Sequence, residues 1–280
     1  MSLSLKDFLK GLAPEIKIQK NYLRPIVCWV LNISETHYYT SFDAILSTTQ
    51  QNKIFQALLK VSQGMPLSRL LNYREFWSHK FLLNAATLDP RPDSETLIEM
   101  VLELLPQRDK SYRFIDLGTG SGCLILSLLK EYPQSVGTGT DISLEALSMA
   151  QKNAHVHHLQ NRVRFLHTSW TSNIEETFDI ICSNPPYISE SSYSRLSSNV
   201  KNFDPYHALV GGQDGLQCYR EIAVQCNAIL NKNGFIVVEI GIGQEHQVSA
   251  LFEQQSFILS HSKKDLNNII RCLVFTRPTP

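Results

Sequence analysis

Asn184, Pro185, Pro186 and Tyr187 place an amide side chain, a stiff proline pair and an aromatic ring in four consecutive positions. They follow the apolar run 178–183, which indicates a buried strand that ends in a rigid turn. The Asn184 side-chain oxygen and the Pro185 carbonyl can each accept one N–H of a substrate NH2 group. We therefore expect Asn184, Pro185 and Tyr187 to act at the reaction centre, with Tyr187 packed on a planar substrate and Pro186 limiting backbone freedom.

An amide nitrogen is a poor nucleophile because its lone pair is delocalised into the carbonyl group. A site that alkylates such a nitrogen must orient it and remove its water, and good orientation lowers a barrier by about 7–11 kcal/mol at best. No general base is strictly required, since the nitrogen proton becomes acidic upon alkylation. The plain alternative is an Asn-Pro turn that closes a surface strand. An aromatic residue beside two prolines, just past a buried strand, favours the binding site.

A glycine-rich loop lies 68 residues upstream of Asn184 and also follows an apolar strand. Its residues are Asp116, Leu117, Gly118, Thr119, Gly120, Ser121 and Gly122. Glycines let a backbone turn sharply and approach a ligand closely, and we expect backbone N–H groups at the following helix start to stay free. Asp116 could pair with a ligand ammonium group. The spacing alone would also suit a nicotinamide dehydrogenase, but the acidic residue before the glycines favours S-adenosylmethionine.

Two further residues complete the expected donor site. Asp141 ends the next strand, 25 residues after Asp116, where a carboxylate can accept hydrogen bonds from both ribose hydroxyls. Asp141 could also be the N-cap of the helix that Ser143 and Glu145 open. Trp170 follows the strand that ends at His167, and we expect it to pack on adenine, although a lone tryptophan is more often part of a core.

Composition narrows the class of protein. The chain has 280 residues, 43% of them apolar, and 26 basic residues balance 26 acidic ones. Balance lowers the prior for a nucleic-acid substrate. No apolar stretch approaches a membrane span, and the first residues lack the pattern of a signal peptide, so we expect a cytoplasmic protein without a membrane partner. The six scattered cysteines favour neither zinc nor disulfides, and we interpret His155, His157 and His158 as a polar helix end, with no metal.

The pattern of the chain changes along its length. Residues 1–75 show apolar positions at helical spacing, and Pro14 and Pro25 indicate short helices. Residues 76–95 include a short hairpin linker and two prolines, after which Asp93 or Ser94 could cap a helix that begins near Glu95. Residues 96–280 alternate strands and helices, which predicts a mostly parallel sheet covered on both faces. The predicted strands are 113–117, 136–140, 163–167, 178–183, 235–240, 257–260 and 269–276, and the predicted helices include 124–131, 144–154, 218–230 and 245–254.

Taken together, the motifs resemble those of the N5-glutamine methyltransferases that modify peptide chain release factors. The resemblance covers nearly the whole chain. Beyond the glycine loop and Asn184–Tyr187, it includes segments 74–77, 90–95, 203–205, 208–209 and 211–216, the run 239–241 with Gln244, and 265–266 with Arg271. Departures are Ser169, where the family often has an acidic residue before the tryptophan, and Asp89, where an aliphatic residue is usual.

The resemblance implies a seven-stranded Rossmann-like class I methyltransferase sheet (96–280) behind a small helical N-terminal domain (1–75) that helps to grip the release factor. It implies that Gly118–Gly122, Asp141, Trp170 and Asn184 bind S-adenosylmethionine, leaving S-adenosylhomocysteine as product. The substrate is then the glutamine of a Gly-Gly-Gln loop, held against Asn184–Tyr187. Gly211-Gly212-Gln213 looks like that loop, but it belongs to a family motif, so we do not expect self-modification.

Three alternatives remain open at this point. A ribosomal-protein glutamine methyltransferase would use the same chemistry on another protein. Methyltransferases of the adenine amino group carry a related tetrapeptide whose tyrosine stacks on a flipped base, but they need a nucleic-acid recognition region and usually a basic face. A scaffold that only binds S-adenosylmethionine would leave Asn184–Tyr187 without a purpose.

Overall fold

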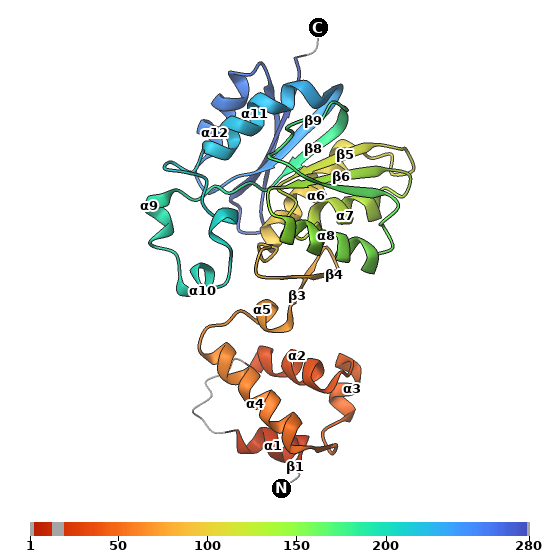
Figure 1. Cartoon of the computed structure of the whole chain (residues 1–280), viewed down its shortest axis with the longest axis vertical. Coiled ribbons are helices and arrows are strands. Elements are labelled where there is room, and N and C mark those ends of the chain that lie inside the picture. The colour runs from red at the N-terminus through yellow and green to blue at the C-terminus, as the bar shows by residue number, and fades with distance from the viewer. Residues whose placement is uncertain (1–2, 13–19, 279–280) are drawn as a thin grey trace. The chain divides into compact units, whose positions relative to one another are not determined.

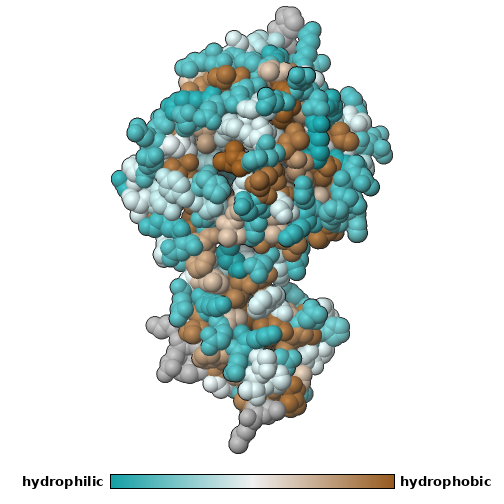
Figure 2. Space-filling model, in the orientation of Figure 1, coloured by the Kyte–Doolittle hydropathy of each residue, from teal (hydrophilic) through white to brown (hydrophobic). Residues whose placement is uncertain are grey.

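The structure is a computed structural model that describes residues 3–12 and 20–278, and the chain divides into two compact units, Met1–Asn72 and Tyr73–Pro280 (Figure 1). The predicted hairpin therefore belongs to the second unit. Figure 2 shows mostly hydrophilic residues on the visible surface of each unit, with hydrophobic residues in small patches between them.

The N-terminal unit is helical, as expected, with one short two-stranded ladder. It contains β1 (Leu3–Ser4), α1 (Leu5–Gly11), α2 (Lys20–Leu31), α3 (Glu35–Thr40), β2 (Ile45–Leu46), α4 (Thr48–Ser62) and α5 (Leu67–Leu71). In α4, Ile54, Leu58 and Val61 are buried, as expected for apolar residues at helical spacing, whereas Phe55 is exposed.

The two prolines of this unit have different outcomes. Pro25 does not end a helix, because it lies inside α2. Pro25 is the sixth of the twelve residues of α2, so the break expected there does not occur, although the missing N–H removes one intrahelical bond. The helices of this unit are nevertheless short, as predicted. Pro14 lies outside the described residues.

The second unit begins with the predicted hairpin, β3 (Tyr73–Phe76) and β4 (His79–Leu82), paired antiparallel. A 3-10 turn, η1 (Pro92–Ser94), then leads into α6 (Glu95–Leu104). Ser94 occupies the N-cap position of α6, but its side chain makes no capping hydrogen bond. The predicted helix start and the N-cap position of Ser94 are confirmed, but the capping hydrogen bond is absent, so the Ser94 hydroxyl is available for other contacts.

The core of this unit is a seven-stranded, mostly parallel sheet, as the resemblance implies. Its strand order is β10-β11-β9-β8-β5-β6-β7, in which β5 to β9 run parallel and β11 pairs antiparallel with both β9 and β10, so that β11 alone is reversed in this sheet. The strands are β5 (Arg113–Leu117), β6 (Val136–Asp141), β7 (Val163–His167), β8 (Phe178–Ser183), β9 (Leu230–Glu239), β10 (Ile258–Lys264) and β11 (Ile270–Thr276). The predicted strands coincide with these within a few residues, apart from an early start of β9 and a later end of β10.

Helices cover both faces of the sheet (Figure 1). They are α6, α7 (Cys123–Glu131) and α8 (Leu144–Val156) on one side, and α11 (Gln217–Ile229) and α12 (Glu245–Glu253) on the other. Successive residues of β8 alternate between the two cores: Ile180 and Cys182 pack with α6 and α7, and Ile181 packs with α11. This two-residue period shows why the strands read as continuous apolar runs.

A long connection between β8 and α11 was not predicted as an element. It contains α9 (Glu190–Tyr193), α10 (Ser198–Lys201) and η2 (Tyr206–Ala208). Asp204 anchors it to the segment before α6, because its carboxylate accepts hydrogen bonds from the Arg91 guanidinium (2.6 Å) and the Asp89 backbone N–H (3.2 Å). Within the described ranges, no helix has the length and apolarity needed to cross a membrane.

Candidate functional site

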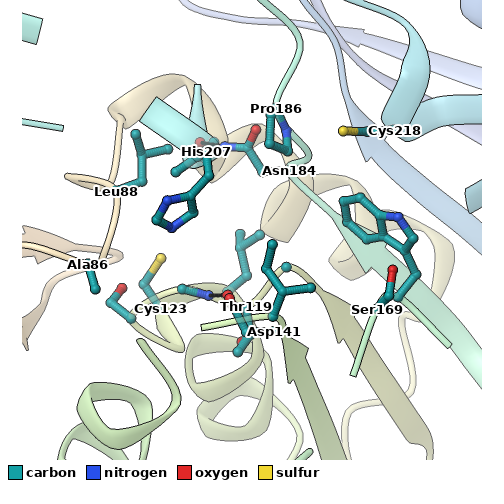
Figure 3. A pocket seen from close by; sticks show the side chains of 18 of the residues that line it. Ala86, Leu88, Thr119, Cys123, Asp141, Ser169, Asn184, Pro186, His207 and Cys218 are labelled. Atoms are coloured by element: carbon teal, nitrogen blue, oxygen red, sulfur yellow. Dashed lines mark hydrogen bonds between the residues drawn. The ribbon is translucent and has the colours of Figure 1, made fainter. Parts of the chain in front are cut away.

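A cavity of about 390 Å³ opens at the carboxyl ends of β5, β6, β7 and β8 (Figure 3). From β5 the strands β6 and β7 follow outward on one side, while β8 lies on the other side of β5. The strand order therefore reverses between β5 and β8. Such a switch point is where ligands bind in open α/β sheets. The lining residues are Ala86, Leu88, Pro90, Ser94, Gly118–Ser121, Cys123, Leu124, Asp141, Ile142, Thr168–Trp170, Asn184, Pro186, Tyr206–Ala208, Val210, Cys218 and Glu221.

The glycine loop forms one wall of the cavity. Gly118, Gly120 and Gly122 all have positive φ angles, of 73°, 54° and 80°, which an L side chain rarely adopts. The N–H groups of Gly118 and Thr119 donate to the Thr140 carbonyl, and Gly122 N–H donates to the Thr119 carbonyl. The loop uses these N–H groups to hold its own turn. They precede the start of α7 at Cys123, to which the expectation of free N–H groups applied.

Asp141 lines the cavity and holds the loop in place. One carboxylate oxygen accepts the Gly120 N–H (2.9 Å), and the other accepts the Ser143 N–H (2.9 Å). The N-cap of α8 is Ser143, whose hydroxyl accepts the Ala146 N–H, so the alternative role predicted for Asp141 is wrong. A carboxylate oxygen accepts more than one hydrogen bond, and the half-exposed Asp141 keeps capacity for ribose hydroxyls.

Asp116 lies beneath the cavity and is not part of its lining. The side chain is fully buried, and one carboxylate oxygen accepts a hydrogen bond from the Thr119 hydroxyl (2.6 Å) while the other has no partner in the described chain. Burial raises the pKa of Asp116 to about 7. A cationic ligand group near this carboxylate would therefore stabilise a charge that the protein alone stabilises poorly.

Trp170 forms the opposite wall, with Ser169 beside it (Figure 3). Its φ angle is 51°, a strained value for a large side chain, and strained residues of this kind cluster at binding sites. The indole N–H donates to the Glu221 carboxylate of α11 (2.7 Å), which fixes the ring plane. Trp170 also approaches Gly118, because a Cβ added there would lie 3.4 Å from the ring.

Asn184 reaches the cavity directly after β8. Its side-chain NH2 donates to the Ser94 hydroxyl (2.9 Å), and no donor in the described chain pairs with its side-chain oxygen or with the Pro185 carbonyl. Pro186 lines the cavity beside it, whereas Pro185 and Tyr187 do not. The Tyr187 hydroxyl donates to the Glu239 carboxylate (3.3 Å), and burial raises the pKa of this phenol, which stays a donor.

Two glycines and a glutamine support this turn. A Cβ at Gly211 would lie 2.3 Å from the Pro186 carbonyl oxygen, and one at Gly215 would lie 2.4 Å from the Tyr187 carbonyl oxygen. The Gln244 side-chain NH2 donates to the Tyr187 carbonyl (3.0 Å). Gly211 and its neighbours therefore serve as close packing for Asn184–Tyr187, which explains their presence in a motif that resembles a substrate loop.

We predict that Gly211→Ala displaces the Pro186 carbonyl and costs about 1–3 kcal/mol of stability, since backbone atoms give way less readily than side chains. Thermal unfolding and methyl transfer, measured on the same preparation, should both decline. Gly11→Ala is the matched control, because nothing lies within 4 Å of a Cβ added at Gly11. A melting temperature equal to that of the unsubstituted protein would show that the close approach is not obligatory.

Several functional residues were not singled out from the sequence. Tyr206, His207 and Glu221 line the cavity, and His207 points into it in Figure 3. Glu239 was noted only as part of a resemblance, although it ends a buried apolar strand in the same way as Asp116. That shared signal could have identified it.

The histidine cluster and the cysteines were interpreted from the sequence as structural. His155 lies in the last turn of α8 and His157 is its C-cap, which confirms the predicted helix end. All six cysteines are free thiols. Among residues 3–12 and 20–278, no group of three His, Cys, Asp or Glu side chains could hold a metal ion.

Comparisons with known proteins agree with this geometry. Residues 91–201 match the family model of the methyltransferase small domain. A release factor glutamine methyltransferase of Agrobacterium fabrum is 39% identical over 257 residues, which cover 91% of this chain and 89% of that relative. Another, of Francisella tularensis subsp. tularensis, is 37% identical over 254 residues, covering 90% and 89%.

Solved structures share the fold at lower identity. The catalytic domain of hMettl16, in complex with MAT2A 3′UTR hairpin 6, has a TM-score of 0.59 at 15% identity and covers 76% of this chain and 82% of that one. The ribosomal protein L11 methylase of Lactobacillus delbrueckii subsp. bulgaricus has a TM-score of 0.52 at 20% identity, covering 69% and 83%. At these identities the likeness concerns the fold alone.

Proposed function

Since this chain belongs to the release factor glutamine methyltransferase family, we propose that its cavity binds S-adenosylmethionine and presents the donor methyl group to a glutamine amide held by Asn184 and Pro185. The chain is a methyltransferase that modifies the side-chain amide of a release-factor glutamine. The observation that carries the assignment of roles is the position of Asn184, whose side-chain oxygen has no donor in the described chain and lies on the same cavity as the glycine loop, Asp141 and Trp170.

The residues of this site fit the donor. Asp141 offers carboxylate oxygens to ribose hydroxyls, and Trp170 offers a flat face to adenine. Asp116 is buried behind this lining and would act on a cationic group of the donor only through its charge. Glycines at 118 and 120 let the backbone approach the ligand. When bound, S-adenosylmethionine supplies an electrophilic methyl group on a sulfonium ion. We propose no metal role.

Asn184 and Pro185 provide two acceptors for one NH2 group. Two acceptors fix the plane of the substrate amide, and the apolar surroundings of Pro186, Leu88 and Ala208 keep water away from the nitrogen. The Tyr187 ring lies behind the residues that line the cavity, so we assign it to the support of the turn. Its ring would contact the substrate only after lining residues move aside. The substrate we propose is the glutamine of the Gly-Gly-Gln loop of a peptide chain release factor.

We further propose that the N-terminal unit contributes to holding the release factor. Among the described residues of this unit, five large apolar side chains are exposed, Leu3, Trp29, Tyr39, Ile45 and Phe55, with Ile45 at 66% and Tyr39 at 60% exposure. Exposed aromatic residues of this kind are enriched at protein interfaces. A release factor acts in translation, so the proposal places the enzyme in the cytoplasm, with no membrane or nucleic-acid partner.

The proposed substrate is tested with methyl-labelled S-adenosylmethionine offered in parallel to a release factor, a ribosomal protein and DNA. We expect label on the release factor, lost when the glutamine of its Gly-Gly-Gln loop is changed to alanine. In the same assay Trp29→Ala should raise the KM for the factor without changing donor affinity. Label on the ribosomal protein or DNA alone would reject the substrate, and no label on any of them would favour a scaffold.

A further inference from the structure

Asn184 and Tyr187 are connected through a buried carboxylate that lies outside the cavity. The Asn184 NH2 group donates to the Ser94 hydroxyl (2.9 Å). The Ser94 hydroxyl lies close enough to the Glu239 carboxylate to lower the pKa of that group, and one oxygen of this buried carboxylate has no other partner among the described residues. The Tyr187 hydroxyl donates to one oxygen of the same carboxylate (3.3 Å). Glu239 is 1% exposed at the end of β9, and it does not line the cavity.

The charge on Glu239 sets the direction of these hydrogen bonds. An ionised carboxylate only accepts, so Ser94 must turn its single hydrogen toward Glu239. The lone pairs of Ser94 then face Asn184 and require an N–H donor there. The Asn184 NH2 group satisfies that requirement, which leaves its side-chain oxygen toward the cavity, where a substrate NH2 group needs an acceptor.

A protonated Glu239 would remove this constraint. A carboxylic acid can donate to the Ser94 oxygen, which frees the Ser94 hydrogen to point at Asn184. The Asn184 amide could then rotate by half a turn and place its NH2 group in the cavity. Two NH2 groups would face each other, and the substrate would lose one of its two acceptors.

The surroundings of Glu239 bring the protonation of its carboxylate close to neutral pH. The pKa of Glu239 is raised to about 7, chiefly by burial and also by Asp93, while Ser94, the nearby Arg271 of β11 and the Tyr187 hydroxyl act in the opposite direction. Arg271 is itself shared, because it also pairs with Asp265 (3.0 Å) and Asp93 (3.3 Å). The remaining titratable neighbours are Tyr219, whose hydroxyl donates to the Glu239 backbone carbonyl, and Cys272, its pairing partner on β11.

We propose that Glu239 and Ser94 are positioning residues that hold the Asn184 amide with its oxygen toward the substrate. This proposal rests on the proposed function of Asn184. Ser94 stands at the N-cap of α6, but its hydroxyl makes no capping hydrogen bond and is bonded to Asn184 instead. This is a second observation that connects the hydroxyl with the site. Neither residue reacts with donor or substrate.

The proposal predicts a pH dependence of turnover. The active form needs ionised Glu239, so kcat should be low at acidic pH and rise as the pH increases through about 7. Glu239→Gln should lower the plateau kcat about tenfold and remove this limb, because the introduced amide can donate to Ser94 at every pH. Ser94→Ala should lower kcat several-fold and flatten the same limb. The Kd for S-adenosylhomocysteine should stay unchanged in Glu239→Gln, since Glu239 does not line the cavity.

A double-substituted protein separates positioning from a general loss of structure. If Ser94 and Glu239 act in series, Ser94→Ala with Glu239→Gln should be no worse than the more damaged single variant, whereas independent structural losses would multiply. Ser127→Ala is the matched control, since Ser127 is a buried hydroxyl of α7 with no partner in the described chain. Melting temperatures of all variants identify any that fold poorly, and Ser94→Thr should recover activity if the hydroxyl itself matters.

The outcomes distinguish this proposal from the proposed function. If the unsubstituted protein labels the release factor but Glu239→Gln keeps both its kcat and its acidic limb, the positioning role is rejected and the function stands. Multiplicative losses in the double variant also reject it. If the unsubstituted protein labels no release factor, the proposed function fails and this proposal fails with it.

Discussion

Asn184→Ala is expected to lower kcat by about 5- to 150-fold while changing the Kd for the donor far less. The substitution removes one of two acceptors for the substrate NH2 group, and an unmade hydrogen bond in a dry site costs about 1–3 kcal/mol, where 1.36 kcal/mol is a factor of ten in rate. The upper part of this range applies because the remaining Pro185 carbonyl cannot fix the plane of the amide alone. Single-turnover methyl transfer to a release factor and calorimetry with S-adenosylhomocysteine measure the two quantities.

Asn231→Ala serves as the control for Asn184→Ala. The Asn231 side chain also makes one hydrogen bond, to the Asp179 carboxylate (2.7 Å), but at the opposite, amino-terminal edge of β8 and away from the cavity. It should leave kcat unchanged. Turnover of Asn184→Ala equal to that of the unsubstituted protein would remove the amide from the reaction, and an equal loss in Asn231→Ala would attribute the effect to folding.

The sheet was predictable because its signal is local. A central strand such as β8 is buried on both faces, so the residues 178–183 form one apolar run that ends at the first polar turn residue. The ends of β9 and β10 were missed for a physical reason. β9 begins at Leu230, directly after α11, and its first residues are a polar stretch without a strand-like pattern. β10 is an exposed edge strand with little apolar pattern.

The site was predictable only in the parts that lie next to strand ends. The glycine loop, Asp141, Trp170 and Asn184 each follow a parallel strand, and parallel strands bring their carboxyl ends to one edge. The wall formed by Tyr206 and His207 comes from a connection without periodicity. Its position depends on long-range contacts such as Asp204 with Arg91, which span more than a hundred residues of sequence and leave no local pattern.

Ser94 illustrates a different limit. Its sequence context, before a helix and after two prolines, is typical of an N-cap, and it occupies that position. The hydroxyl nevertheless bonds Asn184, 90 residues away, because folding places α6 beside the end of β8. A side chain that breaks its local rule in this way is a marker of function, and it cannot be recognised before the tertiary contact is known.

Asp141→Ala is expected to weaken donor binding by about 10- to 150-fold, with a smaller effect on kcat at saturating donor. Hydrogen bonds to a charged acceptor contribute about 1.5–3 kcal/mol, and Asp141 would lose those to the ribose hydroxyls. The substitution also removes the acceptor of the Gly120 and Ser143 N–H groups, which loosens the glycine loop itself. Calorimetry with S-adenosylhomocysteine and with an analogue that lacks both ribose hydroxyls separates these two causes.

If Asp141 binds the ribose, the analogue should bind more weakly than S-adenosylhomocysteine to the unsubstituted protein, and equally weakly to Asp141→Ala. If Asp141 only holds the loop, both ligands should lose the same factor on substitution. Asp179→Ala is the control, because Asp179 also accepts two hydrogen bonds, from the Arg113 N–H (2.8 Å) and Asn231 (2.7 Å), at the far edge of the sheet. If Asp141→Ala binds the donor as tightly as the unsubstituted protein, Asp141 does not bind the ribose. The nucleoside would then be held by Trp170 and the backbone of the glycine loop alone.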